Sequence, residues 1–377
     1  MKSIAQRFLQ KTCIIITLAL FAFPTMASVY FIPQNYNTLP EWQQSRINNK
    51  LLTAIKASCQ RNLMLYPYYF QSNFDIRGEL PWMISCQGIL NIPAQANSKS
   101  AKTILETYFQ PYLVVHNFSR QGLFTGYYLP EIKGSLTKTP YYQIPIYAMP
   151  QKKSNIPYRE QINAGMLPDA QALAWIHNPV DLYFMQVQGS GKILLPKGQS
   201  VLLGYAGQNG FPYYPIGRFL KDIGATKPKG SIQTLESWLN NNPAMAQNIM
   251  NIDASYVFFK ILNTPEPLGA EKIPLTPGHS LAVDTGYIPL GTPIWLSSFY
   301  PSNTDPNSHG TAFTRMMVAQ DTGGAINGPI RGDIYWGSGA RAKDLASHLA
   351  SPGTYWVLLP TALNTGIMND KATLTEF

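Results

Sequence analysis

The stretch "QDTGGAINGPIRGDIYWGSG" (320–339) places two carboxylates, Asp321 and Asp333, among glycines and apolar residues in a chain with few charges. Ile, Tyr and Trp follow Asp333 directly, and desolvation beside such side chains favours the neutral carboxylic acid. A carboxyl group that stays protonated near neutral pH can donate its proton to a leaving oxygen, as glycosidic cleavage requires. The stretch therefore indicates general-acid chemistry at Asp333, with Asp321 across a Gly-rich turn to orient it.

A structural interpretation of the same acids stands beside this one. Asp284 in "LAVDTGYIPL" and Asp321 each end an apolar, strand-like run, a position where Asp commonly caps a turn. Arg331 stands two residues before Asp333 and could form a plain salt bridge with one of the acids. The residue pattern by itself leaves the catalytic and the structural interpretations open.

A second candidate segment is "QVQGSGKILLPKG" (186–198), whose GSGK suggests a phosphate-binding loop. The Walker pattern requires Gly at position 186 and Ser or Thr at position 193, where this chain has Gln186 and Ile193. Ser190 does not lie in the GxSxG pattern of a hydrolase nucleophile either. The segment is therefore a tight turn between two strands, or a place where glycines let main-chain N–H groups approach a ligand.

Tyrosines gather beside Gly and Pro in "FTGYYLP" (124–130) and "GYAGQNGFPYYPIGRFL" (204–220). Aromatic rings next to glycines suit stacking on the flat faces of sugar rings. The alternative is that these tyrosines are ordinary half-buried strand residues. The tyrosines concerned are Tyr127, Tyr128, Tyr205, Tyr213 and Tyr214.

Composition indicates a turn-rich β protein. Of 377 residues, 13% are charged, 28 are Gly, 30 are Pro and 22 are Tyr, which is too apolar for disorder. The length allows one large domain or two, each with its own core. Helical spacing is confined to 38–64, 102–112, 216–250 and a run near 338–353 that Gly353 would end, and strand-like runs, including "DLYFMQVQGSGKILLP" (181–196), fill most of the rest.

The first 27 residues are typical of a signal peptide. A basic start precedes the short apolar run "CIIITLALFAF" (13–23), and small residues surround Ala27. An uncleaved N-terminal anchor is the alternative. Cys13 precedes the apolar run, so no cysteine suitable for lipid modification follows it. A periplasmic protein is predicted, without an outer-membrane lipid anchor.

The net charge bears on which partners the chain could bind. Cleavage after Ala27 would remove three of the 29 Lys and Arg and none of the 20 acids, which changes the net charge from +9 to +6. That net charge suits binding to an anionic polymer or surface, or simply keeps the protein soluble.

Two cysteines, Cys59 and Cys86, remain after cleavage and could form one disulfide or stay as two buried thiols. Neither a metal nor a cofactor is predicted, because there is no CxxC and the five His are scattered. They are His116, His177, His279, His309 and His348.

Several segments together resemble the membrane-bound lytic murein transglycosylase A family. They run in the family's order from about 123 to 339. The segments are "FTGYYLPEI", "DLYFMQVQGSGKI", "GYAGQNGFPYYPIGRFL", "SYVFF", "PLTPGHSLAVDTGYIPLGTPIWL" and "MVAQDTGGAINGPIRGDIYWGSG".

The resemblance implies a mainly β fold with peripheral helices. A double-psi β-barrel catalytic domain would comprise 28–117, with its N-terminal helices, and 252–377. A smaller β-barrel, inserted over 118–251, would bind substrate, with the substrate groove between the two. Peptidoglycan glycan strands are the expected partner, with wall-synthesis or wall-remodelling proteins as further partners. A monomer is expected, and nucleic acid is not.

The resemblance also implies an activity and the residues that carry it. The enzyme would be a peptidoglycan lytic exotransglycosylase, a murein lyase that cleaves the β-1,4 bond between N-acetylmuramic acid and N-acetylglucosamine and forms 1,6-anhydromuramoyl products. Asp333 maps onto the catalytic aspartate, and Asp321 and Asp284 onto supporting acids. The expected substrate-binding residues are Thr125, Gly126, Tyr127, Tyr128, Gln186, Gln188, Gly189, Ser190, Gly191, Tyr205, Gly323 and Gly324.

One carboxyl group suffices for such a reaction. Ordinary glycoside hydrolases need two, because one must activate water or attack the anomeric carbon. Here the C6 hydroxyl of the sugar is the acceptor, so Asp333 can first act as the acid and then as the base. Two alternatives stay open: a non-catalytic, expansin-like peptidoglycan-binding module, and a hydrolase that uses Asp333 and Asp321 as a pair.

Overall fold

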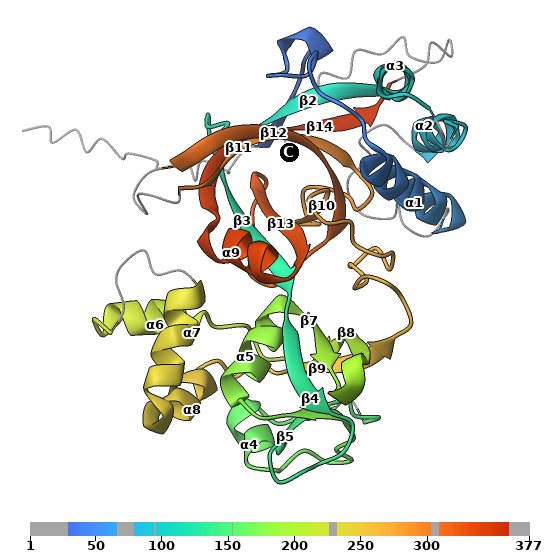
Figure 1. Cartoon of the computed structure of the whole chain (residues 1–377). Coiled ribbons are helices and arrows are strands. Elements are labelled where there is room, and N and C mark those ends of the chain that lie inside the picture. Colours follow the sequence, from blue (N-terminus) through green and yellow to red (C-terminus); the bar gives the residue numbers. More distant parts are fainter. Residues whose placement is uncertain are drawn as a thin grey trace, which may run out of the picture.

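The structure, a computed structural model, is mainly β with helices at its periphery (Figure 1), which confirms the predicted fold class. The predicted signal peptide, residues 1–27, lies outside the described part of the chain. None of the helices in that part has the length and apolar character needed to span a membrane. The described residues are 29–65, 79–93, 96–152, 154–225, 232–302 and 309–361.

Six strands close into a barrel. Their order is β14-β11-β12-β10-β13-β3, and β3 pairs back onto β14. Two of the pairings, β10 with β12 and β13 with β3, are parallel, and the others are antiparallel. Two parallel pairs in a closed six-stranded barrel agree with the predicted double-psi arrangement. The strands are β3 (Gly122–Leu129), β10 (Ser280–Val283), β11 (Pro293–Pro301), β12 (His309–Asp321), β13 (Arg331–Ser338) and β14 (Ala350–Pro360).

Two more strands and three helices extend one side of the barrel. β2 (Phe109–His116) pairs with the end of β14, and β1 (Val29–Pro33) pairs with β2. The helices lie beside these strands, and a disulfide joins Cys59 on the first to Cys86 on the second, with their Cα atoms 4.9 Å apart. Of the two sequence alternatives, the structure therefore has the disulfide. The helices are α1 (Asn49–Leu65), α2 (Glu79–Leu90) and α3 (Ser98–Tyr108).

Helix α1 begins later than the sequence predicts. The helical spacing starts at 38, but the backbone before Asn48 turns, and Glu41 has a positive φ of 55°. The Leu51 amide donates to Asn48 Oδ1 at 2.8 Å, so Asn48 caps the helix. Trp42 still reaches the core, where its ring meets that of Trp295 edge-on with centroids 5.0 Å apart.

A second sheet has the order β5-β6-β4-β7-β8-β9. A bridge between Ala148 and Phe259 brings its two edge strands together, so this sheet also curls toward a barrel. The strands are β4 (Glu131–Ser135), β5 (Ile144–Tyr147), β6 (Ala172–Ile176), β7 (Ser190–Leu194), β8 (Ser200–Gln208) and β9 (Val257–Leu262). Its helices are α4 (Arg159–Asn163), α5 (Pro179–Gln188), α6 (Ile216–Asp222), α7 (Ile232–Asn241) and α8 (Pro243–Asn251).

The sequence prediction of a strand for the run that begins at 181 is wrong, because residues 181–188 lie in helix α5. Asn178 Oδ1 accepts from the Val180 amide, Pro179 occupies the first turn, and Gly189 ends the helix in the left-handed region. The helix is buried around most of its surface, so its apolar residues show no one-sided helical period. Its start and stop signals, and not its hydrophobic pattern, therefore identify it.

The chain passes between the two sheets twice. β3 runs into β4 through Pro130 as one continuous stretch (Figure 1), and residues 263–279 lead from β9 back to β10. Domain limits at 118 and 251 stay a prediction. The helix predicted for 338–353 is confirmed as α9 (Ala340–His348), although Gly353 lies inside β14 and not just past the helix. Helix α9 packs on β3 and β13.

Candidate active site

Across three adjacent strands of the barrel, two aspartates lie on either side of an alanine. Ala282 of β10 pairs with Asp321 of β12 on one side and with Asp333 of β13 on the other. Across β13, Asp333 pairs with Thr125 of β3. Residues directly opposite each other in a sheet project to the same face. We call Asp321, Ala282, Asp333 and Thr125 the aspartate row.

The aspartate row faces away from the main core of the barrel. Phe124 and Ile334, which alternate with members of the row along β3 and β13, are buried in the main core. Successive side chains of a strand point to opposite faces. The row therefore shares its face with Tyr127 and Tyr335, which form a separate apolar cluster that Leu202 of the second sheet touches. The acids thus lie on the side of the barrel that meets the second sheet.

Asp333 is half-buried and held from one side. The Thr125 hydroxyl donates to Asp333 Oδ1 at 2.6 Å, and Arg331 Nη2 donates to the same hydroxyl oxygen at 2.8 Å. Burial raises the pKa of Asp333 to about 6. The Thr125 hydrogen bond and the Arg331 guanidinium lower this pKa, while the charge of Asp321 raises it. Such a carboxyl group is protonated in mildly acidic solution and can serve as an acid.

Arg331 does not form the salt bridge that the sequence allowed. Its Nη1 donates to the main-chain carbonyls of Gly332 and Leu123, at 2.5 and 3.3 Å. Among the ion pairs of the described residues, none joins Arg331 to Asp321 or Asp333. The guanidinium therefore acts on Asp333 through Thr125 and through space.

Three donors hold Asp321. The Tyr127 hydroxyl donates to Oδ2 at 2.8 Å, and the main-chain amides of Ala270 and Thr322 donate to Oδ1 at 2.9 Å each. Burial raises the pKa of Asp321, although these three hydrogen bonds and the charge of Lys272 lower it. Both oxygens of Asp321 are thus engaged by the protein itself.

Asp284 caps turns, in line with the structural interpretation of this acid. Its carboxylate accepts from the Gly286 amide at 2.9 Å and from the Gly328 amide at 2.7 Å. Gly328 belongs to the loop between β12 and β13. Asp284 therefore fixes the loop that separates the two acids of the row, and its carboxylate lies in turns rather than in the row.

The segment 186–191 is divided between two surroundings. Gln188 Oε1 accepts from the Tyr128 amide at 3.0 Å, which ties the end of α5 to β3. Gly189 ends the helix, and Ser190 and Gly191 begin β7. Gln186 lies elsewhere: its side chain is buried, accepts from Arg159 Nη1 and donates to the Val257 carbonyl of β9. The predicted tight turn between two strands is therefore wrong, because Gly189 joins a helix to a strand, and Gln188 is the member held against β3.

The remaining predicted binding residues lie in three places. Tyr205 is 46% exposed on β8. Gly126 and Tyr128 of β3 face α9, where a Cβ on Gly126 would lie 2.5 Å from Trp336 Nε1. Gly323 and Gly324 are exposed in the loop after β12, and a Cβ on Gly324 would lie 4.0 Å from Tyr213 Cβ. That loop therefore faces the aromatic segment 209–215.

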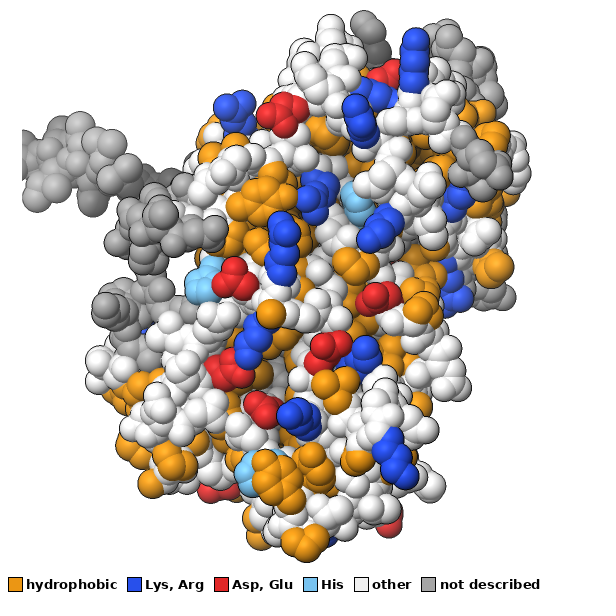
Figure 2. Space-filling view, in the orientation of Figure 1, with side chains coloured by type: hydrophobic (Ala, Val, Ile, Leu, Met, Phe, Trp, Pro, Cys, Tyr) orange, Lys and Arg blue, Asp and Glu red, His pale blue; other side chains and the backbone are white. Residues whose placement is uncertain are grey.

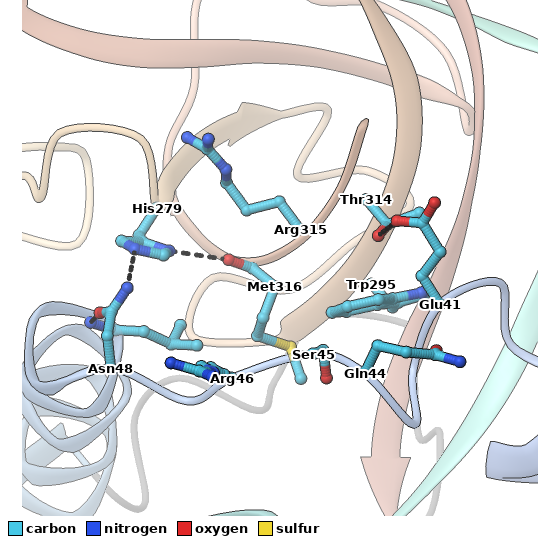
Figure 3. Close-up of a pocket in the computed structure, with 11 residues that line it drawn as sticks. Glu41, Gln44, Ser45, Arg46, Asn48, His279, Trp295, Thr314, Arg315 and Met316 are labelled. Atoms are coloured by element: carbon cyan, nitrogen blue, oxygen red, sulfur yellow. Dashed lines mark hydrogen bonds between the residues drawn. The ribbon is translucent and has the colours of Figure 1, made fainter. Parts of the chain in front are cut away.

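A cavity of about 720 Å³ lies at the other end of β10 (Figure 3). The aspartate row is near the C-terminal end of this strand, whereas His279 of the cavity directly precedes its first residue. His279 Nδ1 faces the Met316 carbonyl at 2.9 Å, and Nε2 faces Asn48 Nδ2 at 3.3 Å. The cavity is thus a separate feature from the site of the acids. Its lining residues are Glu41, Gln44, Ser45, Arg46, Asn48, Leu51, His279, Trp295, Thr314, Arg315 and Met316.

Charges of both signs are scattered over the face of the molecule seen in Figure 2, between apolar side chains. The described residues contain no group of three or more His, Cys, Asp or Glu placed to hold a metal ion.

Two family models match the chain. The MltA specific insert domain matches residues 123–260, and the 3D domain matches residues 279–359. The solved structure of the lytic transglycosylase LtgG of Burkholderia pseudomallei is 30% identical, with 90% of this chain and 98% of that one covered and a TM-score of 0.57. The chain belongs to the MltA family.

Other MltA proteins agree with this membership. The membrane-bound lytic murein transglycosylase A of Escherichia coli (strain K12) is 37% identical over 238 residues, which is 62% of this chain. The match spans 65% of that relative, just under two thirds of its length. The crystal structure of E. coli MltA with bound chitohexaose is 28% identical, covers 88% of this chain and 94% of that one, and has a TM-score of 0.68. The family predicted from the sequence is therefore confirmed.

Sequence reasoning missed three contributors to the site of this MltA-family chain. Ala270 donates its main-chain amide to Asp321, and Ala282 separates the two acids. Tyr335 packs on Tyr127 with ring centroids 5.2 Å apart. Only Tyr335 had a usable signal, because strand alternation places it two residues from Asp333 on the same face.

Proposed function

We propose that this MltA-family chain is a lytic transglycosylase. It would cleave the β-1,4 bond between N-acetylmuramic acid and N-acetylglucosamine in peptidoglycan and leave 1,6-anhydromuramoyl ends. One observation carries the proposal: the half-buried carboxyl group of Asp333 has a pKa raised to about 6 and is held at Oδ1 by Thr125. The names of the relatives support the substrate class.

In the first step, protonated Asp333 acts on the leaving oxygen. The bond between C1 of N-acetylmuramic acid and O4 of N-acetylglucosamine breaks, its electron pair stays on O4, and O4 takes the Asp333 proton. Positive charge then develops at C1, where the N-acetyl group of the same sugar assists. Because the carboxyl group is neutral before this step, Asp333 meets the substrate as a donor.

In the second step, the Asp333 carboxylate acts as the base. The C6 hydroxyl oxygen of N-acetylmuramic acid bonds to C1 and closes the anhydro ring, while its proton passes to Asp333. The carboxylic acid is thereby restored, and no water is consumed. One carboxyl group therefore completes the cycle.

The hydrogen bonds to Asp321 favour a positioning role for this residue over that of a nucleophile. A second catalytic carboxylate needs a free oxygen directed at water or at the anomeric carbon. Asp321 Oδ1 receives two main-chain amides and Oδ2 receives the Tyr127 hydroxyl. We infer that Asp321 orients the site and adjusts the charge that Asp333 experiences.

The glycan strand would lie where the barrel meets the second sheet. Tyr127 of the row's face, Gln188 at the end of α5 and the loop of Gly324 opposite Tyr213 surround this junction. Chitohexaose is bound to the E. coli MltA structure, which supports a cleft suited to a β-1,4-linked chain. Export by residues 1–27 and action in the periplasm belong to the same proposal.

The test is digestion of purified peptidoglycan followed by mass spectrometry of the products. The proposal expects 1,6-anhydromuramoyl ends from the wild-type chain, and no products from Asp333→Asn although that variant still binds the polymer. Reducing ends in place of anhydro ends would identify a two-carboxylate hydrolase. Binding without products from either protein would identify a non-catalytic module.

A further inference from the structure

A fully buried acid, Glu271, lies next to the site without touching it. Glu271 has no exposed surface and belongs to the segment 263–279 between β9 and β10. The Ser58 hydroxyl of α1 donates to Glu271 Oε2 at 2.7 Å, and Oε1 has no hydrogen-bond partner within the described residues. Burying a carboxyl group is costly, so its retention here calls for a function.

Glu271 is part of a buried polar chain. Gln320 Nε2 donates to Ser58 Oγ at 2.9 Å and to the Ala54 carbonyl at 3.0 Å. The Ser280 hydroxyl donates to Gln320 Oε1 at 2.5 Å. The network thus joins α1, the segment of Glu271, and strands β10 and β12.

Two main-chain segments of the network, at Glu271 and at Gln320, lead directly to Asp321. The Glu271 amide donates to the Gln320 carbonyl at 3.1 Å. Ala270 directly precedes Glu271, Asp321 directly follows Gln320, and the Ala270 amide donates to Asp321 Oδ1 at 2.9 Å. Any shift of Glu271 relative to Gln320 would therefore move a donor of Asp321.

The Glu271 side chain is one of several ties that hold the segment 263–279 in place. It forms no regular helix or strand, and Lys272 has a positive φ of 64°. A Cβ on Gly269 would lie 2.3 Å from the Gln320 carbonyl oxygen, so the segment packs tightly against β12. Main-chain bonds hold the segment to itself and to β12, from the Leu275 amide to the Pro267 carbonyl at 2.9 Å and from the Glu271 amide to Gln320. The Glu271 side chain adds the tie to Ser58 of α1.

We propose that Glu271 is a positioning residue that holds the Ala270 amide on Asp321 and, through Asp321, sets the charge that the catalytic acid Asp333 experiences. The effect of Glu271 on turnover rests on the proposed transglycosylase function. Burial raises the pKa of Glu271 to about 7, while the Ser58 hydroxyl and the Arg61 guanidinium lower it. Since Ser58 can donate to either protonation state, the anchor does not require the charge.

The direct test is a titration of the aspartate carboxyls by NMR in wild type, Glu271→Ala and Glu271→Gln. Glu271→Ala removes the tie to Ser58 and loosens the Ala270 amide on Asp321, so the pKa of Asp321 should rise by about 1. The pKa of Asp333 should then fall, because Asp321 is less often charged. Glu271→Gln keeps an oxygen for Ser58 and should titrate like wild type. If the enzyme turns over substrate, kcat should fall about 10-fold in the Ala variant with KM unchanged.

A matched pair of serines separates positioning from general loosening of the core. Ser58 and Ser85 are both 1% exposed on helices, but Ser85 donates to the Tyr108 carbonyl, away from Asp321. Ser58→Ala should move the titrations of both aspartates in the same directions as Glu271→Ala. Ser85→Ala should lower stability and leave both titrations unchanged.

Wild-type titrations of Asp321 and Asp333 in both Glu271→Ala and Ser58→Ala would overturn the proposal. So would equal shifts in Glu271→Gln and Glu271→Ala, because the charge and not the anchor would then matter. If an Ala variant does not fold, Glu271→Asp replaces it, since its shorter side chain withdraws from Ser58. The carboxyls titrate whether or not the chain cleaves peptidoglycan, so a wild type without anhydro products would refute the proposed function alone.

Discussion

The Thr125 hydroxyl donates to Asp333 Oδ1 at 2.6 Å across the parallel pairing of β3 and β13. The two residues are 208 positions apart in the sequence. This bond stabilises the carboxylate of Asp333, opposes the effect of burial on its pKa, and fixes the direction of the carboxyl group. The effect on the pKa and the effect on orientation lead to separate predictions.

Thr125→Val should raise the pKa of Asp333, because a hydrogen bond to the anion is lost while Arg331 stays bound to main-chain carbonyls. The basic limb of the kcat profile should move to higher pH, and kcat should fall about 10-fold because the acid loses its orientation. Thr125→Ser retains the hydroxyl and should keep both the profile and the rate. An unchanged profile in Thr125→Val would contradict the assigned role of this bond.

Asp321→Asn should move the basic limb in the opposite direction. The charge of Asp321 raises the pKa of Asp333, so its removal should lower that pKa, and activity should be lost at a lower pH than in wild type. We expect kcat at the optimum to fall by about 10- to 100-fold. The measurement is the release of anhydro products between pH 4 and 8, and a basic limb that stays in place would refute the coupling.

Asp333→Asn should stabilise the fold above pH 6 while abolishing activity. The folded pKa of about 6 exceeds the ordinary value of 3.8, so between these pH values the folded chain holds a proton that the unfolded chain releases. The contribution of Asp333 to the free energy of unfolding therefore falls as pH rises through this range, by about 2 kcal/mol when partial exposure is allowed for. Other buried acids such as Glu271 also lose stability over this range, in both proteins. In urea unfolding at pH 4 and pH 7.5, the loss should therefore be about 2 kcal/mol smaller in the variant than in wild type.

The control for that experiment is Asp344→Asn. Asp344 is an exposed acid on α9, with 58% of its side chain accessible and His348 as its partner. Its replacement should leave the difference between the two pH values as in wild type. Equal behaviour of the two variants would mean that the pH dependence does not arise from Asp333.

Replacing both Cys59 and Cys86 by Ala should lower the free energy of unfolding by about 3 kcal/mol, because the bond closes a loop with a sequence separation of 27. Reducing agent should produce the same loss in wild type and have no effect on the double variant. Urea unfolding with and without reductant measures both. Insensitivity of the wild type to reductant would exclude a closed bond in solution.

Local patterns in the sequence identified much of this protein correctly. An acid followed by three apolar residues predicted a carboxyl group with a raised pKa, although of the three only Tyr335 lies on the same face of β13 as Asp333. The density of Gly, Pro and Tyr predicted a mainly β fold. Where a pattern failed, a local signal had been overlooked. Helix α5 is buried on most sides and shows no amphipathic period, but Asn178 and Gly189 mark its two ends.

Contacts between distant segments could not be read from the same patterns. The sequence offered Arg331 as a salt-bridge partner of an acid two residues away, yet in a strand such neighbours point to one face without touching, and Thr125 of another strand comes between. Ala270 has no side-chain chemistry, so nothing marked its amide as a ligand of Asp321.

The sequence by itself determined which residue types could act: a carboxyl group among apolar neighbours, a second acid after a strand, and caps at the ends of helices. Residue types and the signals at helix ends belong to the chain itself, and folding does not change them. Only the tertiary structure decided that Ala282 separates the acids, that Tyr127 and Ala270 hold Asp321, and that Asp284 serves turns. Strand pairing and register create those contacts, and they are fixed by the packing of the whole barrel.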